Sequence, residues 1–206
     1  AELSEAEKLR LQTQLVLIRA AADLANPADV FGDLIILNRY GYEVNEFATI
    51  LNAFGRLEKF SDCLSLIRSF DRELAERVLR DYQRELARAL SVAEQIAEVR
   101  GKVLLLNFGK RINANFVSPI ASIFARMRKE PVILAAALEA GEAKISIRNK
   151  SNAPVHELVR EIAQGLGGEG GGHLEACGAR VSASSASSFL EEFIRRVNEL
   201  LNSCSL

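Results

Sequence analysis

Glycine is concentrated in one short stretch near the C-terminal end of the chain, GLGGEGGGHLEACGARVS at residues 165–182. Seven of the 13 glycines lie between Gly165 and Gly178. The densest run comprises Gly170, Gly171, Gly172 and His173. Because glycine has no Cβ, it can take a positive φ and let a ligand touch the backbone. This run is therefore the first candidate for a binding site.

The chemistry that suits this run is anion binding. We expect a glycine turn that opens a short helix from Gly170 to about Cys177, whose free N–H groups would bind a phosphate. The His173 ring could donate a further hydrogen bond. The run lacks the GxGxxG spacing of a dinucleotide site and the Lys-Ser/Thr pair of a P-loop. The alternative is a flexible linker, which the amphipathic helix predicted before the run disfavours.

A second candidate lies in the segment KISIRNKS, residues 144–151. In a strand, Ser146 and Arg148 point to one face, while Ile145 and Ile147 point to the other, into the core. On an open sheet face, a guanidinium beside a hydroxyl would bind two phosphate oxygens at once. The alternative is an ordinary solvated strand face.

Helical patterns dominate the first half of the chain. Ser4 and Glu7 form a capping-box pattern that predicts a helix to about residue 26. A short apolar run at 33–37 is a possible strand, and an amphipathic segment at 46–70 is expected to break at Gly55. A long helix is predicted over 71–100, where neither glycine nor proline occurs.

From residue 101 the pattern changes to alternating strands and helices. Strands are predicted at 102–108, 131–138, 143–149 and 178–182, with a hairpin turn at 139–142. Helices are predicted at 116–129, 154–166 and 187–201. The sequence therefore predicts an α/β protein. A helical segment at 1–100, containing the long connecting helix, would precede a mixed-sheet α/β domain at 101–206.

Composition and charge restrict the function classes. The hydrophobic share of 49% can supply a core, and no apolar run approaches a membrane span. Cys63, Cys177 and Cys204 form no CxxC pair, which disfavours a zinc site or a disulfide framework and favours a reduced, cytoplasmic protein. Net charge is −4 over 1–100, +6 over 101–150 and −3 over 151–206. The basic middle could attract an anionic ligand, or its charges could scatter over several faces.

The two candidate motifs together resemble the DHH-associated domain of the DHH phosphoesterase superfamily. Its pattern is a strand with S-x-R, a helix, then GGGH-x-x-A-x-G and another strand. The matching residues here are Ser146, Arg148, Gly170, Gly171, Gly172, His173, Ala176 and Gly178. The resemblance implies that Arg148 and the glycine run hold a phosphate with help from Ser146.

The first half is similar to the same superfamily. The segment EFATILNAFGR, from residue 46, resembles the LNAxGR segment that leads from the catalytic domain of RecJ-like nucleases into the connecting helix. The matching residues are Leu51, Asn52, Ala53, Gly55 and Arg56. The form of this segment that begins with EFATILNA is most similar to archaeal RecJ-like proteins, which are relatives of a replisome factor that travels with the GINS complex. The resemblance covers residues 33 to 200.

One departure from this family concerns catalysis. Active members hold two manganese or magnesium ions through an Asp-x-Asp motif, an Asp-His-His signature and further aspartates. This sequence contains neither motif, and its only histidines are His156 and His173. Because two-metal cleavage needs clustered ligands, we expect no cofactor and no hydrolysis from this chain alone. A manganese or magnesium site would require a catalytic domain elsewhere.

The sequence thus predicts a non-catalytic module that binds single-stranded DNA or RNA in replication or repair. Secondary contacts are expected from Arg56, Lys144, Lys150, Lys110 and Arg111. One alternative is an interaction scaffold for a GINS-like complex, with a vestigial pocket. Another is the C-terminal half of an active exonuclease or phosphodiesterase. No membrane partner is expected. If the metal domain had been cut away, the cut would be expected at residue 100, so the helical start slightly favours a naturally short protein or a piece chosen for partner binding.

Overall fold

The computed structural model describes residues 4, 6–7, 10–11, 13–14 and 34–203. The chain divides into a unit at 1–49 and a larger unit at 50–206. In the part described, no helix combines the length and apolarity that a membrane span requires.

The smaller unit begins with the predicted capping box. The Ser4 backbone N–H donates to Glu7 Oε2 at 2.8 Å, and the Glu7 N–H donates to Ser4 Oγ at 3.4 Å. The rest of the predicted helix falls largely outside the described residues. Of the run at 33–37, only β1 (Ile36–Leu37) is a strand, and it pairs antiparallel with β2 (Tyr42–Glu43). Residue 33 lies outside the described residues.

Helices α2 (Val44–Arg56), α3 (Phe60–Arg68) and α4 (Arg72–Ile96) follow in sequence. The break predicted at Gly55 comes later, because α2 runs through Gly55 to Arg56 and the chain turns at Glu58, whose φ is 58°. An N-cap at Asp71 begins α4, since its carboxylate accepts from the Leu74 N–H at 3.1 Å.

The long helix is shorter than the prediction of 71–100. It ends at Ile96, and the next residues form β3 (Glu98–Arg100), an antiparallel partner of β4 (Val103–Gly109). The sequence does not reveal where this helix ends, because neither glycine nor proline occurs between its last residue and Gly101. Backbone bonds to β4 take the place of further helical turns.

The larger unit is built on a six-stranded mixed sheet of order β3-β4-β5-β6-β8-β7. Strand β5 (Val132–Glu139) is parallel to β4, and β6 (Glu142–Asn149) returns antiparallel through the predicted turn, where Ala140 and Gly141 have φ of 49° and 84°. Between β4 and β5 come η2 (Ala114–Phe116) and α5 (Val117–Met127). The predicted α/β class with a mixed sheet is confirmed.

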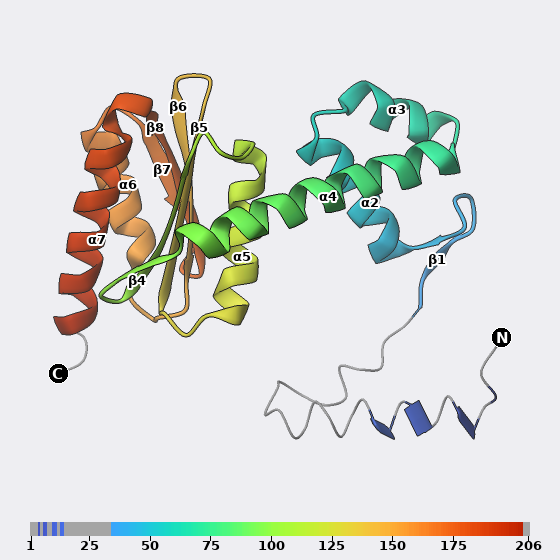
Figure 1. Cartoon of the computed structure of the whole chain (residues 1–206), viewed down its shortest axis with the longest axis horizontal. Coiled ribbons are helices and arrows are strands. Elements are labelled where there is room, and N and C mark those ends of the chain that lie inside the picture. Colours follow the sequence, from blue (N-terminus) through green and yellow to red (C-terminus); the bar gives the residue numbers. More distant parts are fainter. Residues whose placement is uncertain (1–3, 5, 8–9, 12, 15–33, 204–206) are drawn as a thin grey trace. The chain divides into compact units, whose positions relative to one another are not determined.

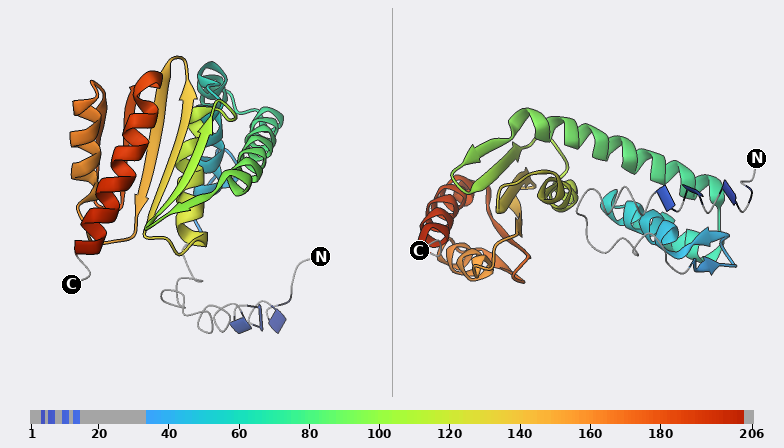
Figure 2. Two further views of the ribbon diagram at one scale, coloured as in Figure 1. Left: turned by 60° about the vertical axis from the view of Figure 1, so that its left-hand side comes forward. Right: turned by 90° about the horizontal axis from the view of Figure 1, so that it is seen from below.

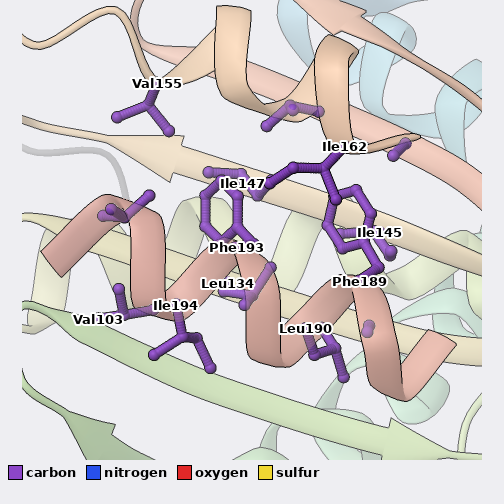
Figure 3. Packing of buried hydrophobic residues seen from close by; sticks show 14 of the residues in the cluster. Val103, Leu134, Ile145, Ile147, Val155, Ile162, Phe189, Leu190, Phe193 and Ile194 are labelled. Carbon is purple, nitrogen blue, oxygen red and sulfur yellow. The ribbon is translucent and has the colours of Figure 1, made fainter. Parts of the chain in front are cut away.

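Helices cover the two faces of this sheet unequally (Figures 1 and 2). On one face, α6 (Val155–Gly165) and α7 (Ala186–Ser203) bury a continuous core. The rings of Phe189 and Phe193 stack there with their centroids 5.9 Å apart, in the same core as Ile145 and Ile147 (Figure 3). On the other face, α5 packs on β5 and β6. The glycine-bearing strands beyond β6 therefore border an open part of that face.

The predicted helix at 170–177 is wrong. Residues Glu169–Gly172 form the edge strand β7, which pairs antiparallel with β8 (Ala176–Ser182), and two hydrogen bonds between His173 and Ala176 close the turn of this hairpin. Gly170 and Gly172 of this hairpin lie too close to neighbouring backbone to carry a side chain. A Cβ on Gly170 would lie 2.7 Å from the Val159 carbonyl oxygen, and one on Gly172 would lie 2.5 Å from the Ala176 oxygen.

Candidate functional site

The Arg148 guanidinium is held by three serine hydroxyls. Its Nε donates to Ser122 Oγ at 3.0 Å, and its Nη2 donates to Ser118 Oγ at 2.9 Å, both on α5. Its Nη1 donates to Ser146 Oγ at 3.1 Å and to the Ile147 carbonyl at 3.0 Å. The two residues of the S-x-R motif thus share a face, as predicted. That face is not open at Arg148, because α5 lies against it.

All of these partners are neutral, so the arrangement leaves a positive charge without a counter-ion. Among the described residues, Arg148 forms no ion pair with a carboxylate, and the cationic Arg56 is close enough to repel it. Burial lowers the pKa of the Arg148 guanidinium; the nearby Cys177 acts in the opposite direction, and the positive charge of Arg56 acts in the same direction as burial. An arginine nevertheless stays protonated at neutral pH. A half-buried, unpaired cation is stabilised when an anion binds.

The hydroxyls around Arg148 can assist such an anion. Ser118 and Ser146 accept from the guanidinium, and neither hydroxyl hydrogen is engaged with another described residue. Ser122 differs, because its hydroxyl donates to the Ser118 carbonyl at 3.1 Å. The site therefore offers the remaining guanidinium N–H and two hydroxyl donors to one ligand.

A row of small residues forms the floor next to Arg148. Ser146 pairs with Gly178 across β6 and β8, and Gly178 pairs with Gly171 across β8 and β7, so all three lie on the same face of the sheet. A hollow of about 280 Å³ lies over this row and is bordered by Ser118, Lys144 and Arg148. A Cβ on Gly171 would meet no atom within 4 Å, which places this glycine against open space.

Two further cations lie on the same side as Arg148. Lys144 Nζ donates to Asn115 Oδ1 at 2.9 Å, and Arg56 Nη1 donates to the Asn115 backbone oxygen at 2.9 Å. Burial lowers the pKa of the Lys144 ammonium, and the positive charges of Arg180 and Arg56 add to this effect. Mutual repulsion of these cations is a further cost that a bound anion would relieve.

The hollow continues in both directions along the sheet. Towards the β7 edge, a shallow depression of about 400 Å³ shares Lys144, Gly171 and Gly178 with it and adds Arg180. Past Arg148, a hollow of about 500 Å³ is bordered by Arg126 and Lys150. We call this series of connected hollows the basic groove.

Not every predicted site residue faces the basic groove in the same way. Gly170 contributes its backbone to one wall, but its Cα hydrogens point at α6, and Gly172 packs against Ala176 and Cys177. His173 is exposed at the hairpin turn and lines none of the three hollows. Lys150 borders the groove but donates its ammonium to the Arg128 carbonyl.

Sequence reasoning missed four residues that border the groove, Ser118, Ser122, Arg126 and Arg180, and also Asn115, which holds Lys144. Ser118 and Ser122 are four apart in the predicted helix at 116–129, and this spacing puts them on one face. Arg180 lies two residues after Gly178 in the predicted strand, so it shares the Gly178 face. Asn115 had no pattern to reveal it, because its contacts with Arg56 and Lys144 are formed only by the fold.

The hairpin is fixed by the buried Asn149. Its Nδ2 donates to the Leu174 carbonyl at 2.9 Å and to the Ala153 carbonyl at 3.0 Å, while its Oδ1 accepts from the Ser151 hydroxyl at 2.6 Å. Its backbone N–H donates to the Glu175 oxygen at 2.9 Å. Asn149 follows Arg148 directly, so one short segment joins the cation to the glycine hairpin.

The comparison that decides the family covers the chain from β4 to α7, with only the last residue of β3. The model of the DHHA1 domain matches residues 100–203. The chain belongs to the DHHA1 domain family. All residues that border the basic groove lie within this DHHA1 domain. No curated protein sequence matches the chain.

Solved structures with similar folds come from the DHH superfamily. RecJ from Thermus thermophilus, in complex with Mn²⁺, matches with a TM-score of 0.52 at 19% identity, over 88% of this chain and 27% of RecJ. CDC45 from Entamoeba histolytica matches with a TM-score of 0.53 at 9% identity, over 93% of this chain and 45% of CDC45. At these identities the likeness shows the fold, and the chain spans under half of either protein.

The groove's donor set suits an anion rather than a metal ion. Its polar groups are guanidinium, ammonium, hydroxyl, asparagine amide and backbone groups, with Glu169 and Glu175 as acids at its borders. In the described part of the chain, no three His, Cys, Asp or Glu side chains gather as a metal site would need. A divalent metal pair does not fit these residues.

Proposed function

We propose that this DHHA1 domain binds the phosphate backbone or a terminal phosphate of single-stranded DNA or RNA, without cleaving a bond itself. The observation that carries this proposal is Arg148. The guanidinium is oriented by three serines, lacks a carboxylate partner among the described residues and borders a hollow floored by Gly171 and Gly178. A phosphate supplies the missing charge and accepts from the free donors.

The length of the basic groove supports a strand rather than a lone phosphate. Its cations are Arg126, Arg148, Lys144 and Arg180, with Lys150 at one border, and they span three connected hollows. Successive phosphates could contact successive cations. Phosphate contacts should dominate over stacking, because the chain has no tryptophan and only three tyrosines. Binding should weaken as salt rises.

The motifs suggest a finer assignment, which we include in the proposal. The S-x-R and GGGH residues resemble the pattern of the DHH superfamily, and the LNAxGR segment that ends in Arg56 resembles RecJ-like proteins. The sequence EFATILNA is most similar to the archaeal branch. The chain would then act in DNA replication or repair in the cytoplasm. Manganese or magnesium would enter only through an accompanying catalytic domain, as in an active exonuclease or phosphodiesterase.

A protein partner is a second candidate, favoured by a separate surface. On α3, Phe60, Leu64 and Ile67 are 61%, 62% and 39% exposed, and their spacing puts them on one helix face. An exposed apolar stripe of this kind suits a protein interface. A GINS-like replication complex is the partner that the RecJ-like motifs suggest.

Fluorescence anisotropy with labelled single-stranded DNA and RNA tests the leading proposal. Strands with a 5′-phosphate and with a 5′-hydroxyl would be compared over a salt series. Salt-sensitive binding is expected, and tighter binding of the phosphorylated strands would indicate recognition of an end. No binding at low salt would contradict the proposal and leave the protein-partner candidate.

A further inference from the structure

A separate hollow of about 640 Å³ lies at the carboxyl ends of β4 and β5. It is bordered by the segment that follows Gly109, by the β5–β6 turn and by α4, and it shares no bordering residue with the basic groove. We call it the β4–β5 hollow. In α/β sheets, ligands bind outside the carboxyl ends of adjacent parallel strands. Its volume is also typical of small-ligand sites.

The backbone around this hollow is irregular and exposed. The pairing of β4 with β5 shifts register between Asn107 and Gly109, and Gly109 has a φ of +56°. Gly141, which borders the hollow, has a φ of +84°. A Cβ on either glycine would meet no atom within 4 Å, so both backbones face open space. Bulges of this kind are frequent beside binding sites.

The side chains of the hollow combine a basic rim with apolar walls. Lys110 and Arg111 are exposed on the rim and form no ion pair with any described residue. Arg88 also lies on the rim, at 3.8 Å from Glu85. The apolar residues are Ala89, Ile112, Phe116 and Leu138. Unpaired cations suit a phosphate, while apolar walls suit a sugar or a base.

We propose that the β4–β5 hollow binds a nucleotide, with Lys110 and Arg111 as its phosphate contacts. The acids of the rim, Glu85 and Glu139, would accept from the ligand's hydroxyl or amino groups. The ligand is either a free nucleotide or the end of a strand, since both present the same phosphate chemistry. This proposal does not depend on binding in the basic groove.

Two-dimensional amide NMR of the whole ¹⁵N-labelled chain tests the proposal, with adenosine 5′-monophosphate and a short 5′-phosphorylated oligothymidylate as probes. We expect the Gly109 and Gly141 amides to shift with at least one probe. The Lys110→Gln/Arg111→Gln double variant should bind on the order of tenfold more weakly at this site. Arg77→Gln/Arg160→Gln, which removes equal charge from exposed positions elsewhere, should bind as the wild type does.

The outcomes separate this site from the basic groove. Shifts with the monophosphate identify a free nucleotide, and shifts with the oligonucleotide alone identify a strand end. In either case Arg148→Gln should leave the response of Gly109 and Gly141 intact. The proposal is overturned if neither probe shifts these amides, or if the double variant responds like the wild type.

Discussion

Arg148 on β6 and Ser118 on α5 meet at 2.9 Å, with the guanidinium Nη2 donating to the serine hydroxyl. This contact fixes the cation between a strand and a helix that are far apart in sequence. Orientation matters because a guanidinium binds a phosphate through a planar fork. The proposed site therefore depends on α5 as well as on the motif residues.

Removing the Ser118 hydroxyl should weaken binding without unfolding the domain. Ser118→Ala deletes one hydrogen bond to Arg148 and one donor to the ligand, together worth about 1 kcal/mol, or roughly a fivefold loss of affinity for single-stranded DNA. Anisotropy titrations measure this loss. Ser91→Ala, at an exposed position of α4, is the control. Equal affinities of the two variants would show that Ser118 does not contribute.

Two neighbouring glycines should respond differently to alanine. A Cβ on Gly171 meets open space above the groove floor, so Gly171→Ala should keep the melting temperature and lower affinity for the strand. A Cβ on Gly170 would lie 2.7 Å from the Val159 oxygen, so Gly170→Ala should destabilise the domain by about 1–3 kcal/mol. Thermal denaturation and anisotropy of both variants separate the two effects. Equal loss of stability would contradict the assigned faces.

The affinity for a nucleic-acid strand should decline at a lower pH than it would if Lys144 had the pKa of an ordinary lysine. Burial, with the charges of Arg180 and Arg56, lowers the pKa of Lys144, so its cation is lost below the ordinary lysine value of about 10.4. Anisotropy in alkaline buffers should show this decline in the wild type, and Lys144→Arg should reduce it. Because the unfolded chain binds this proton more tightly, the same titration makes the free energy of unfolding rise with pH. Identical pH profiles of both proteins would count against a Lys144 contact.

The Cys177 thiol should be unreactive in the folded protein. Burial raises the pKa of Cys177 to about 12, so almost no thiolate exists near neutral pH. Cys63 is less buried and should react faster. Iodoacetamide labelling followed by peptide mass spectrometry measures both rates, with denatured protein as the reference. Comparable rates in the folded state would show that the β7–β8 hairpin opens readily.

The sequence predicted the sheet better than the glycine run. Period-two alternation placed Ser146 and Arg148 on one face because Ile145 and Ile147 must enter the core. The glycines carry no such pattern, since without side chains a strand and a turn look alike. Only the tertiary contacts of Gly170 with α6, and of Gly172 with β8, distinguish them.

Of the motif residues, Ser146, Arg148 and Gly171 border the groove and His173 does not, while the residues that support the groove were only partly predictable. Spacing could have revealed Ser122 and Arg180, because each repeats on a face that the predicted elements already define. Asn115 and Asn149 could not be found in this way. Their importance comes from hydrogen bonds to Lys144 and to the Leu174 carbonyl, which lie far away in sequence.

The most direct test of the central claim is the affinity of Arg148→Gln for 5′-phosphorylated single-stranded DNA, measured by anisotropy over a salt series beside wild type and Arg77→Gln. The account predicts a loss of at least about tenfold for Arg148→Gln, with a shallower salt dependence, because a charged contact is worth about 1.5–3 kcal/mol. Arg77→Gln should stay close to wild type. Equal affinity of the two variants, both folded, would contradict the role of Arg148 as the phosphate contact.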